Sequence, residues 1–252
     1  MSKTNQTTRF HKLHVKGTPV VLYNAWDAGS AQAIVEAGSK VIATSSWAIA
    51  AAQGYKDGEE IPLDFVERII AKITESVDVP VSVDIEGGYS DDKAVLAKNV
   101  TRLLDLGIVG VNFEDRVVKG SGLYSIEQQA GRIAVIRSAA AKKGIDLFIN
   151  ARTDLFLGRK FDSDKSIREA LDRAKAYADA GASGFFIPGL TDAKLIGRIC
   201  DGVELPVNVM VMDGVPTNQN LSKLGVARIS YGPGSYIEAM EAVTKSAAKV
   251  LS

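Results

Sequence analysis

Short apolar segments alternate with helical patterns along almost the whole chain, and this alternation limits the possible folds more than any other feature. The apolar segments lie at 20–23, 41–44, 81–85, 108–113, 146–150, 184–187, 206–211 and 227–230. Strands that alternate with helices pair in parallel, because each connection crosses back over the sheet. Eight such units predict one α/β domain over residues 1–252, a single (β/α)8 barrel. The alternative is an open doubly wound sheet, but no G-x-G-x-x-G follows the first segment.

Local signals place several helix boundaries. Pro62 is expected at the first position of a helix, and Thr191 is expected to cap another. Ser125 with Gln128 three residues on has the form of a capping box. A long loop is expected from the end of the second strand to the helix at Pro62. Residues 1–18 form a polar lead-in, expected to be a solvated helix.

Composition narrows the class of protein. The 252 residues are 46% apolar and 24% charged, as in a globular protein with a large core. Thirty basic and thirty acidic side chains cancel, so the bulk charge argues for neither a nucleic acid nor a membrane partner. The one cysteine, Cys200, permits no internal disulfide and no cysteine metal cluster. The absence of a signal peptide and of a long apolar run leads us to expect a cytoplasmic protein.

The stretch 81–89, Val-Ser-Val-Asp-Ile-Glu-Gly-Gly-Tyr, places two acids at the end of a buried strand. Asp84 and Glu86 stand two residues apart, and side chains in a strand alternate with a period of two, so both acids are expected to point the same way. Carboxylates held together repel each other unless a cation lies between them. Ligands that are all oxygen favour Mg²⁺, with Mn²⁺ as a substitute. The alternative is a pair of solvated acids in a surface turn.

Polar residues also follow other predicted strands, and barrel enzymes build their sites at that end of the strands. Charge is concentrated after strands three to five, where Glu114, Arg152 and Asp154 follow the acids above. A guanidinium can bind a carboxylate through two parallel hydrogen bonds, so Arg152 suits an anionic substrate. The alternative for Arg152 is a structural ion pair with Asp154 or Glu114. For Ser45 and Ser46, the alternative to substrate binding is local hydrogen bonding.

Six stretches together resemble the isocitrate lyase/phosphoenolpyruvate mutase superfamily. They cover nearly the whole chain in the family's order, at 24–31, 43–46, 54–59, 84–89, 112–115 and 150–154. The resemblance implies a barrel of the phosphoenolpyruvate/pyruvate-binding type that holds Mg²⁺ and a 2-oxo or related carboxylic acid. It further implies C–C or C–P chemistry through an enolate-like species, and a homo-oligomer, either a dimer or a tetramer.

The resemblance also assigns roles by position. The implied holders of Mg²⁺, several of them through water, are Asp57, Asp84, Glu86 and Glu114. The substrate carboxylate would be held by Ser45, Ser46 and the backbone of Trp47. Arg152 would stabilise developing negative charge, and Asn208 would line the pocket.

The loop 116–124 departs from the family's patterns. Isocitrate and methylisocitrate lyases carry a cysteine there as general acid, whereas this loop has neither cysteine nor histidine. Lys119 and Ser121 resemble the Pro-Lys-x-x-Ser loop of the phosphonate branch, without the proline and at altered spacing. Pro188-Gly189 stands where the lyases have a glutamate.

The predicted function is a Mg²⁺-dependent lyase that cleaves a C–C bond of a small 2-oxo or 2-hydroxy di- or tricarboxylic acid through an enolate. Oxaloacetate decarboxylation or retro-aldol cleavage is favoured. Arg152, Lys119 and Glu114 are the predicted catalytic residues, and the glycine-containing loop 116–124 is a candidate lid. Two alternatives stay open. One is C–P chemistry as phosphonopyruvate hydrolase or phosphoenolpyruvate mutase, which Lys119 and Ser121 favour, and the other is a non-catalytic 2-oxo-acid binding protein.

Overall fold

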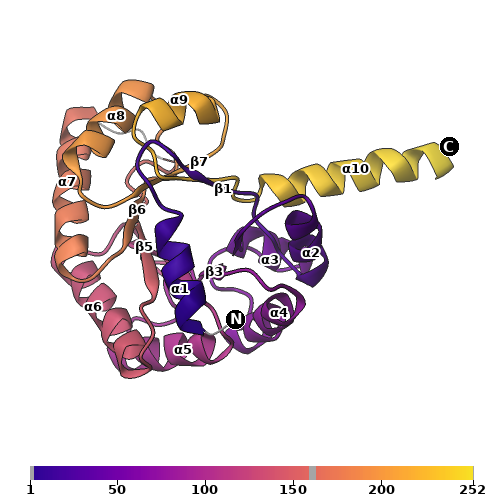
Figure 1. Cartoon of the computed structure of the whole chain (residues 1–252), viewed down its shortest axis with the longest axis horizontal. Helices are drawn as coiled ribbons and strands as arrows, with labels where there is room; N and C mark the ends of the chain where they lie inside the picture. Colours follow the sequence, from indigo (N-terminus) through magenta and orange to yellow (C-terminus); the bar gives the residue numbers. More distant parts are fainter. Residues whose placement is uncertain (1–2, 159–162, 252) are drawn as a thin grey trace.

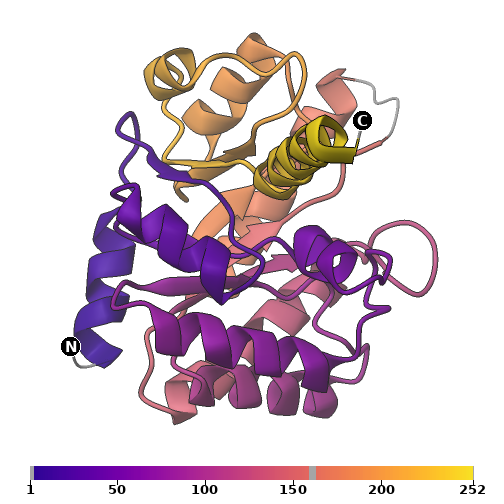
Figure 2. The same cartoon turned by 90° about the vertical axis from the view of Figure 1, so that its right-hand side faces the viewer.

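All eight predicted strands form, and they make one parallel sheet that curls into a barrel (Figures 1 and 2). The computed structural model describes residues 3–158 and 163–251. The strands are β1 (Val20–Leu22), β2 (Ile42–Ala43), β3 (Val81–Asp84), β4 (Gly110–Glu114), β5 (Phe148–Arg152), β6 (Gly184–Phe186), β7 (Val207–Met210) and β8 (Arg228–Ser230). Neighbours in the chain are neighbours in the sheet from β2 to β8, and β1 pairs with β8. A parallel bridge between Ala25 and Thr44 joins the last edge, so the (β/α)8 barrel is confirmed.

Helices connect the strands and surround the barrel (Figure 1). They are α2 (Ala28–Glu36), α3 (Ser46–Ala52), α4 (Leu63–Ser76), α5 (Lys93–Asp105), α6 (Ile126–Lys142), α7 (Ser163–Asp179), α8 (Ala193–Gly202) and α9 (Asn218–Lys223). Their apolar stripes face the sheet: in α4, Val66, Ile70 and Ile73 recur at helical spacing and are buried. Each such side chain stabilises the fold by about 1.5–3 kcal/mol.

Local boundaries agree with the sequence in part. The capping box of Ser125 and Gln128 opens α6 as predicted. The stretch after β2 is not one long loop, because Ser45 caps α3 by accepting the N–H of Ala48 at 3.3 Å. Asp192, rather than Thr191, caps α8. Pro62 is the N-cap residue of α4, with an extended backbone, and not its first helical residue.

The N-terminal lead-in forms the predicted helix, α1 (Lys3–Lys12), but the segment is not simply solvated. Residues 1–2 lie outside the described residues. Phe10 is fully buried, and His14, just after α1, stacks on Phe148 with ring centroids 4.0 Å apart. With Leu22 and Val41 they fill the end of the barrel at which the strands begin. Figure 2 shows α1 covering this end, so the opposite end is the one left open for a site.

The last helix, α10 (Gly234–Leu251), leaves the barrel instead of packing on it (Figure 1). Every residue from Glu238 onward that is described has an exposed or half-buried side chain. The exposed residues include Val243, at 59%, and Val250, at 84%. Within the described part of the chain, no helix is long and apolar enough to cross a membrane.

Candidate functional site

A cavity of about 130 Å³ opens among the ends of the strands opposite α1. Six of the predicted site residues line it, namely Ser45, Ser46, Trp47, Asp57, Asp84 and Arg152. The rest of the lining comes from other strand ends and loops, namely Asn24, Thr44, Asn112, Leu157, Phe186, Met210, Ser230, Gly232 and Pro233. A larger groove, of about 500 Å³, lies between α5 and α6 and is lined mainly by lysine and alanine residues. The smaller cavity is the candidate site, because acids and a guanidinium converge there.

Two carboxylates of the cavity meet at one hydroxyl. Ser46 Oγ donates to Asp84 Oδ2 at 3.0 Å and lies 3.5 Å from Asp57 Oδ1. Asp84 ends β3, whereas Asp57 comes from the loop after α3. Burial of the carboxyl, together with the charge of Asp84, raises the pKa of Asp57 above its ordinary value. The cavity therefore holds negative charge at a density that favours a cation.

Glu86 lies near these acids, but not for the reason that the sequence suggested. It lies beyond the end of β3 in a left-handed conformation, with φ of 49°, so strand alternation does not set its direction. Burial, followed by the charges of Asp57 and Asp84, raises the pKa of Glu86 to about 8. Its Oε1 atom is buried and has no hydrogen-bond partner among the described residues. Such an orphaned acceptor next to two other acids suits a cation or its water shell.

Glu86 and Glu59 tie two loops together in what we call the glutamate clasp. Glu86 Oε2 accepts the N–H groups of Gly58 and Glu59 at 2.8 and 2.9 Å, and Glu59 Oε1 accepts the N–H of Tyr89 at 2.7 Å. In the described chain, Glu59, Glu86 and Tyr89 are the three residues other than glycine with positive φ. Each such conformation costs about 1–2 kcal/mol. Asp57 immediately precedes the clasp, so the clasp fixes where its carboxylate lies.

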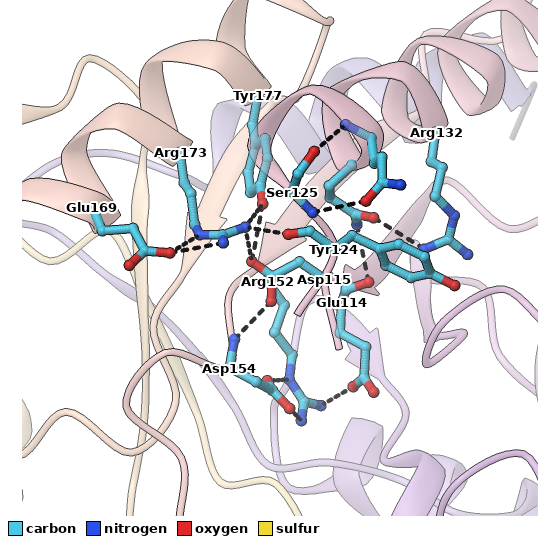
Figure 3. Close-up of polar contacts among 12 residues, drawn as sticks. Glu114, Asp115, Tyr124, Ser125, Arg132, Arg152, Asp154, Glu169, Arg173 and Tyr177 are labelled. Carbon is cyan, nitrogen blue, oxygen red and sulfur yellow. Dashed lines mark hydrogen bonds and ion pairs between the residues drawn. The ribbon is translucent and has the colours of Figure 1, made fainter. Parts of the chain in front are cut away.

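Arg152 is held between two carboxylates at the ends of β4 and β5 (Figure 3). Its Nη1 lies 2.9 Å from Glu114 Oε2, while Nε and Nη2 donate to Asp154 at 2.6 and 3.0 Å. Burial alone would lower the pKa of Arg152, but the charges of Glu114 and Asp154 outweigh it and raise the pKa. These contacts use three of the five N–H groups of a guanidinium, which leaves one on each Nη. The structural ion pair and the substrate role are therefore compatible.

A second buried arginine supports this arrangement from α7 (Figure 3). Asp115, with 0% exposure, accepts Arg173 Nη1 at 3.1 Å, the Tyr177 hydroxyl at 2.9 Å and the Asp154 N–H at 3.0 Å. Arg173 also donates to the Tyr124 carbonyl at 3.0 Å. The network fixes Asp154, which in turn holds Arg152. The sequence analysis did not predict this network. The signal for it was the pair Arg173 and Tyr177, four residues apart on a helix whose other inward residues are apolar.

The structure does not bring every predicted residue to the cavity wall. Glu114 and Glu86 are 3% and 2% exposed and lie behind the lining. Asn208 is fully buried below it and donates to the lining residue Ser230 at 3.2 Å. Ser45 does line the cavity, but its hydroxyl also caps α3, as the local alternative expects. Lys119 is exposed and lines a separate small cleft instead.

The loop 116–124 is anchored more firmly than its two glycines suggest. Its ends pair through a bridge between Arg116 and Leu123. Val118 packs against Gly87 so closely that a Cβ on that glycine would lie 2.7 Å from Val118 Cγ2. The loop thus leans on the turn that follows β3, beside the glutamate clasp.

The donor set of the acids fits Mg²⁺. Burial raises the pKa values of Asp57, Glu86 and Glu114, and the Oε1 atom of Glu86 is orphaned. Within the described residues, no three acidic, histidine or cysteine side chains are arranged to grip an ion directly. A Mg²⁺ ion held here would therefore use one or two of these carboxylates and keep several of its water molecules.

Fold and site together define a class of protein, an α/β barrel whose strand ends present acids and an arginine to a cavity of small-molecule size. Comparison of the sequence with known families agrees with this class. The family described as phosphoenolpyruvate phosphomutase matches residues 10–251. The chain belongs to this family, within the isocitrate lyase/phosphoenolpyruvate mutase superfamily, as the resemblance of its motifs predicted.

Individual relatives cover almost the whole chain. An uncharacterized protein of Mycobacterium tuberculosis is 33% identical over 96% of this chain and 88% of its own length. The 2-methylisocitrate lyase of Escherichia coli is 28% identical over 100% of this chain and 86% of its own. A crystal structure of a candidate phosphonomutase from Burkholderia cenocepacia is 38% identical, with a TM-score of 0.95 over 98% of this chain and 99% of that one.

Proposed function

We propose that this protein is a Mg²⁺-dependent lyase that cleaves a C–C bond of a small 2-oxo or 2-hydroxy di- or tricarboxylic acid. The observation that carries the proposal is the pairing of opposite charges around one cavity. Asp57 and Asp84 face it beside Arg152, whose two free N–H groups remain after Glu114 and Asp154 are bound. A carboxylate substrate bound to a metal ion requires acids that hold the cation and, next to them, a guanidinium that binds the anion.

Different residues of the site would bind the metal ion, stabilise negative charge and bind the substrate. Asp57 and Asp84 would hold Mg²⁺ from the cavity wall, with Glu86 and Glu114 reaching it through water. Bound Mg²⁺, or Mn²⁺ in its place, would neutralise these acids and polarise the substrate oxygens. Arg152 is oriented in advance by Glu114 and Asp154, so it can stabilise an enolate oxygen without reorganising. Ser45, Ser46 and the backbone of Trp47 would receive the substrate carboxylate.

The choice among C–C cleavages follows from the loop 116–124. Without a cysteine or histidine in it, the loop offers no equivalent of the general acid that isocitrate-type cleavage needs, and such a loss costs about 10²–10⁴ in rate. Loss of CO₂ from oxaloacetate leaves a pyruvate enolate, whose charge Arg152 can bear and which solvent water can protonate. A retro-aldol cleavage is favoured on the same terms, when water can reach the enolate that it leaves. Lys119 would act only after the loop closes, because it lies away from the cavity in this structure.

A second candidate function is C–P chemistry on phosphonopyruvate or phosphoenolpyruvate. The matched family is described as phosphoenolpyruvate phosphomutase, and the structure from Burkholderia cenocepacia is that of a candidate phosphonomutase. Lys119 and Ser121 supply the matching feature in the chain. A phosphonate would need more positive charge than Arg152 alone provides, and the charge of Arg116, which acts on Asp57, is one further source.

A substrate panel tests both candidates. The protein would be assayed with Mg²⁺ and with chelator on oxaloacetate, methylisocitrate, isocitrate, dimethylmalate and phosphonopyruvate, with release of pyruvate, glyoxylate and phosphate as readouts. We expect pyruvate from oxaloacetate or a retro-aldol substrate only when Mg²⁺ is present. Phosphate from phosphonopyruvate would favour the second candidate. No turnover of any substrate, despite Mg²⁺-dependent binding of one, would mean a binding protein.

We also propose a homo-oligomer, a dimer or tetramer, in which α10 is the contact. Its apolar residues, among them Met240, Val243 and Val250, recur on one face of the helix and are exposed. An exposed apolar face on an 18-residue helix is costly in water, and a second copy of the chain offers an identical face to cover it.

A further inference from the structure

The centre of the barrel contains a buried guanidinium that forms no hydrogen bond to a carboxylate among the described residues. Arg228, on β8, is 1% exposed, and its Nη2 donates to Asn112 Oδ1 at 3.1 Å. Its Nε and Nη1 atoms have no hydrogen-bond partner in the described chain. By contrast, the buried Arg173 pairs with two carboxylates, Asp115 and Glu169. Burial lowers the pKa of Arg228 to about 9, which leaves it charged at neutral pH.

This charge lies directly beneath the candidate site. Ser230 stands two residues further along β8, so its side chain shares the inward face of the strand with Arg228, one layer nearer the cavity. Ser230 lines the cavity, and so does Asn112, to which Arg228 is bonded. The guanidinium is thus one side chain away from any molecule in the cavity.

Arg228 also determines which way the Asn112 amide points. Asn112 Oδ1 accepts Asn150 Nδ2 at 2.9 Å as well as Arg228 Nη2. A guanidinium has no acceptor, so it can face only the oxygen of the amide. The NH₂ group of Asn112 must then lie on the other side, and no residue of the described chain accepts a hydrogen bond from it.

The arrangement is hard to explain as a stabilising one. The charge of Asp84 raises the pKa of Arg228 but does not outweigh the effect of burial. A buried charge without a hydrogen-bonded carboxylate destabilises a fold, and replacing it with an apolar side chain of similar length is commonly neutral or favourable. Asn112 and Asn150 could bond each other without Arg228. A residue that costs stability and sits under a site points to a role in that site.

We propose that Asn112 is a substrate-binding residue, whose NH₂ group donates to a carboxylate oxygen of the substrate, and that Arg228 is its positioning residue. Arg228 holds the amide in the donating orientation and adds positive charge below the anion. The inference rests on the proposed function, because it takes the ligand to be a small carboxylate. It gives the cavity a floor that attracts an anion, in addition to the wall formed by Arg152.

The proposal predicts opposite effects on the two ligands of the site. Removing the Arg228 charge leaves Mg²⁺ among the same acids with less positive charge nearby, so its affinity stays the same or rises. The same change removes an attraction for the anion and frees the Asn112 amide to turn. A residue with a purely structural role would, when replaced, weaken both ligands together.

The test uses calorimetry on the full-length protein, with Mg²⁺ alone and then with oxalate, a small dicarboxylate, at saturating Mg²⁺. Arg228→Met is expected to bind oxalate about tenfold or more weakly, to keep its Mg²⁺ affinity and to melt no lower than the native protein. Arg137→Met is the matched control: Arg137 is a half-buried arginine bonded to Gly181 and Ser183 on the outside, and its loss should leave both ligands unaffected.

A second variant keeps the test decisive if Arg228→Met does not fold. Asn112→Ala removes the NH₂ donor without adding a charge beneath the anion. It should lose oxalate binding by about tenfold or more and retain Mg²⁺. Oxalate affinity within about twofold of the native value, in Arg228→Met or in Asn112→Ala, would overturn the inference. If the native protein binds neither Mg²⁺ nor oxalate, the proposed function itself fails.

Discussion

At the scale of single residues, the acids of the cavity are held together against their own repulsion. Asp84 is the centre of this group, because its charge contributes to raising the pKa values of both Asp57 and Glu86. In Asp84→Asn that repulsion falls, so the variant should fold at least as stably as the native chain. Its Mg²⁺ affinity, measured by calorimetry, should fall by about tenfold or more.

A matched control for this variant is Asp92→Asn, at the N-cap of α5, where asparagine caps as well as aspartate. It should bind Mg²⁺ as the native protein does. Equal Mg²⁺ affinity in Asp84→Asn and in the control would remove Asp84 from the metal site.

His14, at the closed end of the barrel, predicts how the protein responds to acid. Burial, followed by the charge of Arg228, lowers its pKa from 6.5 to about 3, so the folded protein keeps it neutral while the unfolded chain takes up a proton. Stability is therefore complete above pH 6.5 and is lost as the pH falls toward 3, by about 2 kcal/mol at pH 5. His14→Phe keeps the stack on Phe148 without the titration.

Urea unfolding at pH 7 and pH 5 measures the effect. The loss of stability between these two values should be smaller in His14→Phe than in the native protein by about 2 kcal/mol. His11→Gln, on the half-exposed side of the same segment, should behave as the native protein does. If His14→Phe loses as much stability as the control, the acid response comes from other groups.

Single residues of the site were predictable where one strand supplies them. Asp84 and Arg152 could be placed because the end of a barrel strand is a fixed location, and both line the cavity. Arg228 and Arg173 could not be placed, because their importance comes from partners 116 and 58 residues away in the chain. Nothing local distinguishes a buried arginine on an apolar strand from an exposed one.

At the scale of elements, the glutamate clasp joins the loop before α4 to the turn after β3. Glu59 is its outer member, and its carboxylate accepts the Tyr89 N–H. Glu59→Ala should release the loop that carries Asp57, at a cost of about 1–3 kcal/mol in stability. Mg²⁺ affinity should fall several-fold, and the loop 53–59 should be cut faster by protease.

Two further variants separate the clasp from a general surface effect. Glu59→Gln keeps the acceptor for Tyr89 and should restore the native Mg²⁺ affinity. Glu60→Ala, at the exposed neighbouring position, should change neither the affinity nor the rate of proteolysis. If Glu59→Gln is as defective as Glu59→Ala, charge rather than the backbone contact is what matters.

Elements with strong local signals were predicted well, and short ones were not. The capping box of α6 is complete within four residues of sequence, so it could be found without tertiary information. The helix α3 was missed because its seven residues, largely alanine, carry too few apolar repeats to show a period. The turn at Glu86 was missed because its left-handed backbone depends on N–H groups of another loop.

At the scale of the whole molecule, the barrel follows from the alternation of strands and helices, but the assembly does not. Closure needs only that neighbouring units pair, and each unit carries its own apolar face toward the sheet. The alternation itself does not say whether the last helix packs on its own barrel. In the structure α10 extends away from the barrel (Figure 1). Its position depends on the partner that it contacts, and the sequence of one chain does not identify that partner.

The extended helix gives the last prediction. In a symmetric dimer each change is present twice, so placing a charge on the apolar face of α10 at Val243 should weaken association by about a hundredfold or more. Val243→Glu is expected to shift the mass measured by light scattering toward a single chain, while the far-ultraviolet circular dichroism of the barrel stays unchanged. Lys245→Glu, on the charged face of the helix, should leave the mass as it is. A native protein that is monomeric at micromolar concentration would contradict the proposal that α10 is the contact between two copies of the chain.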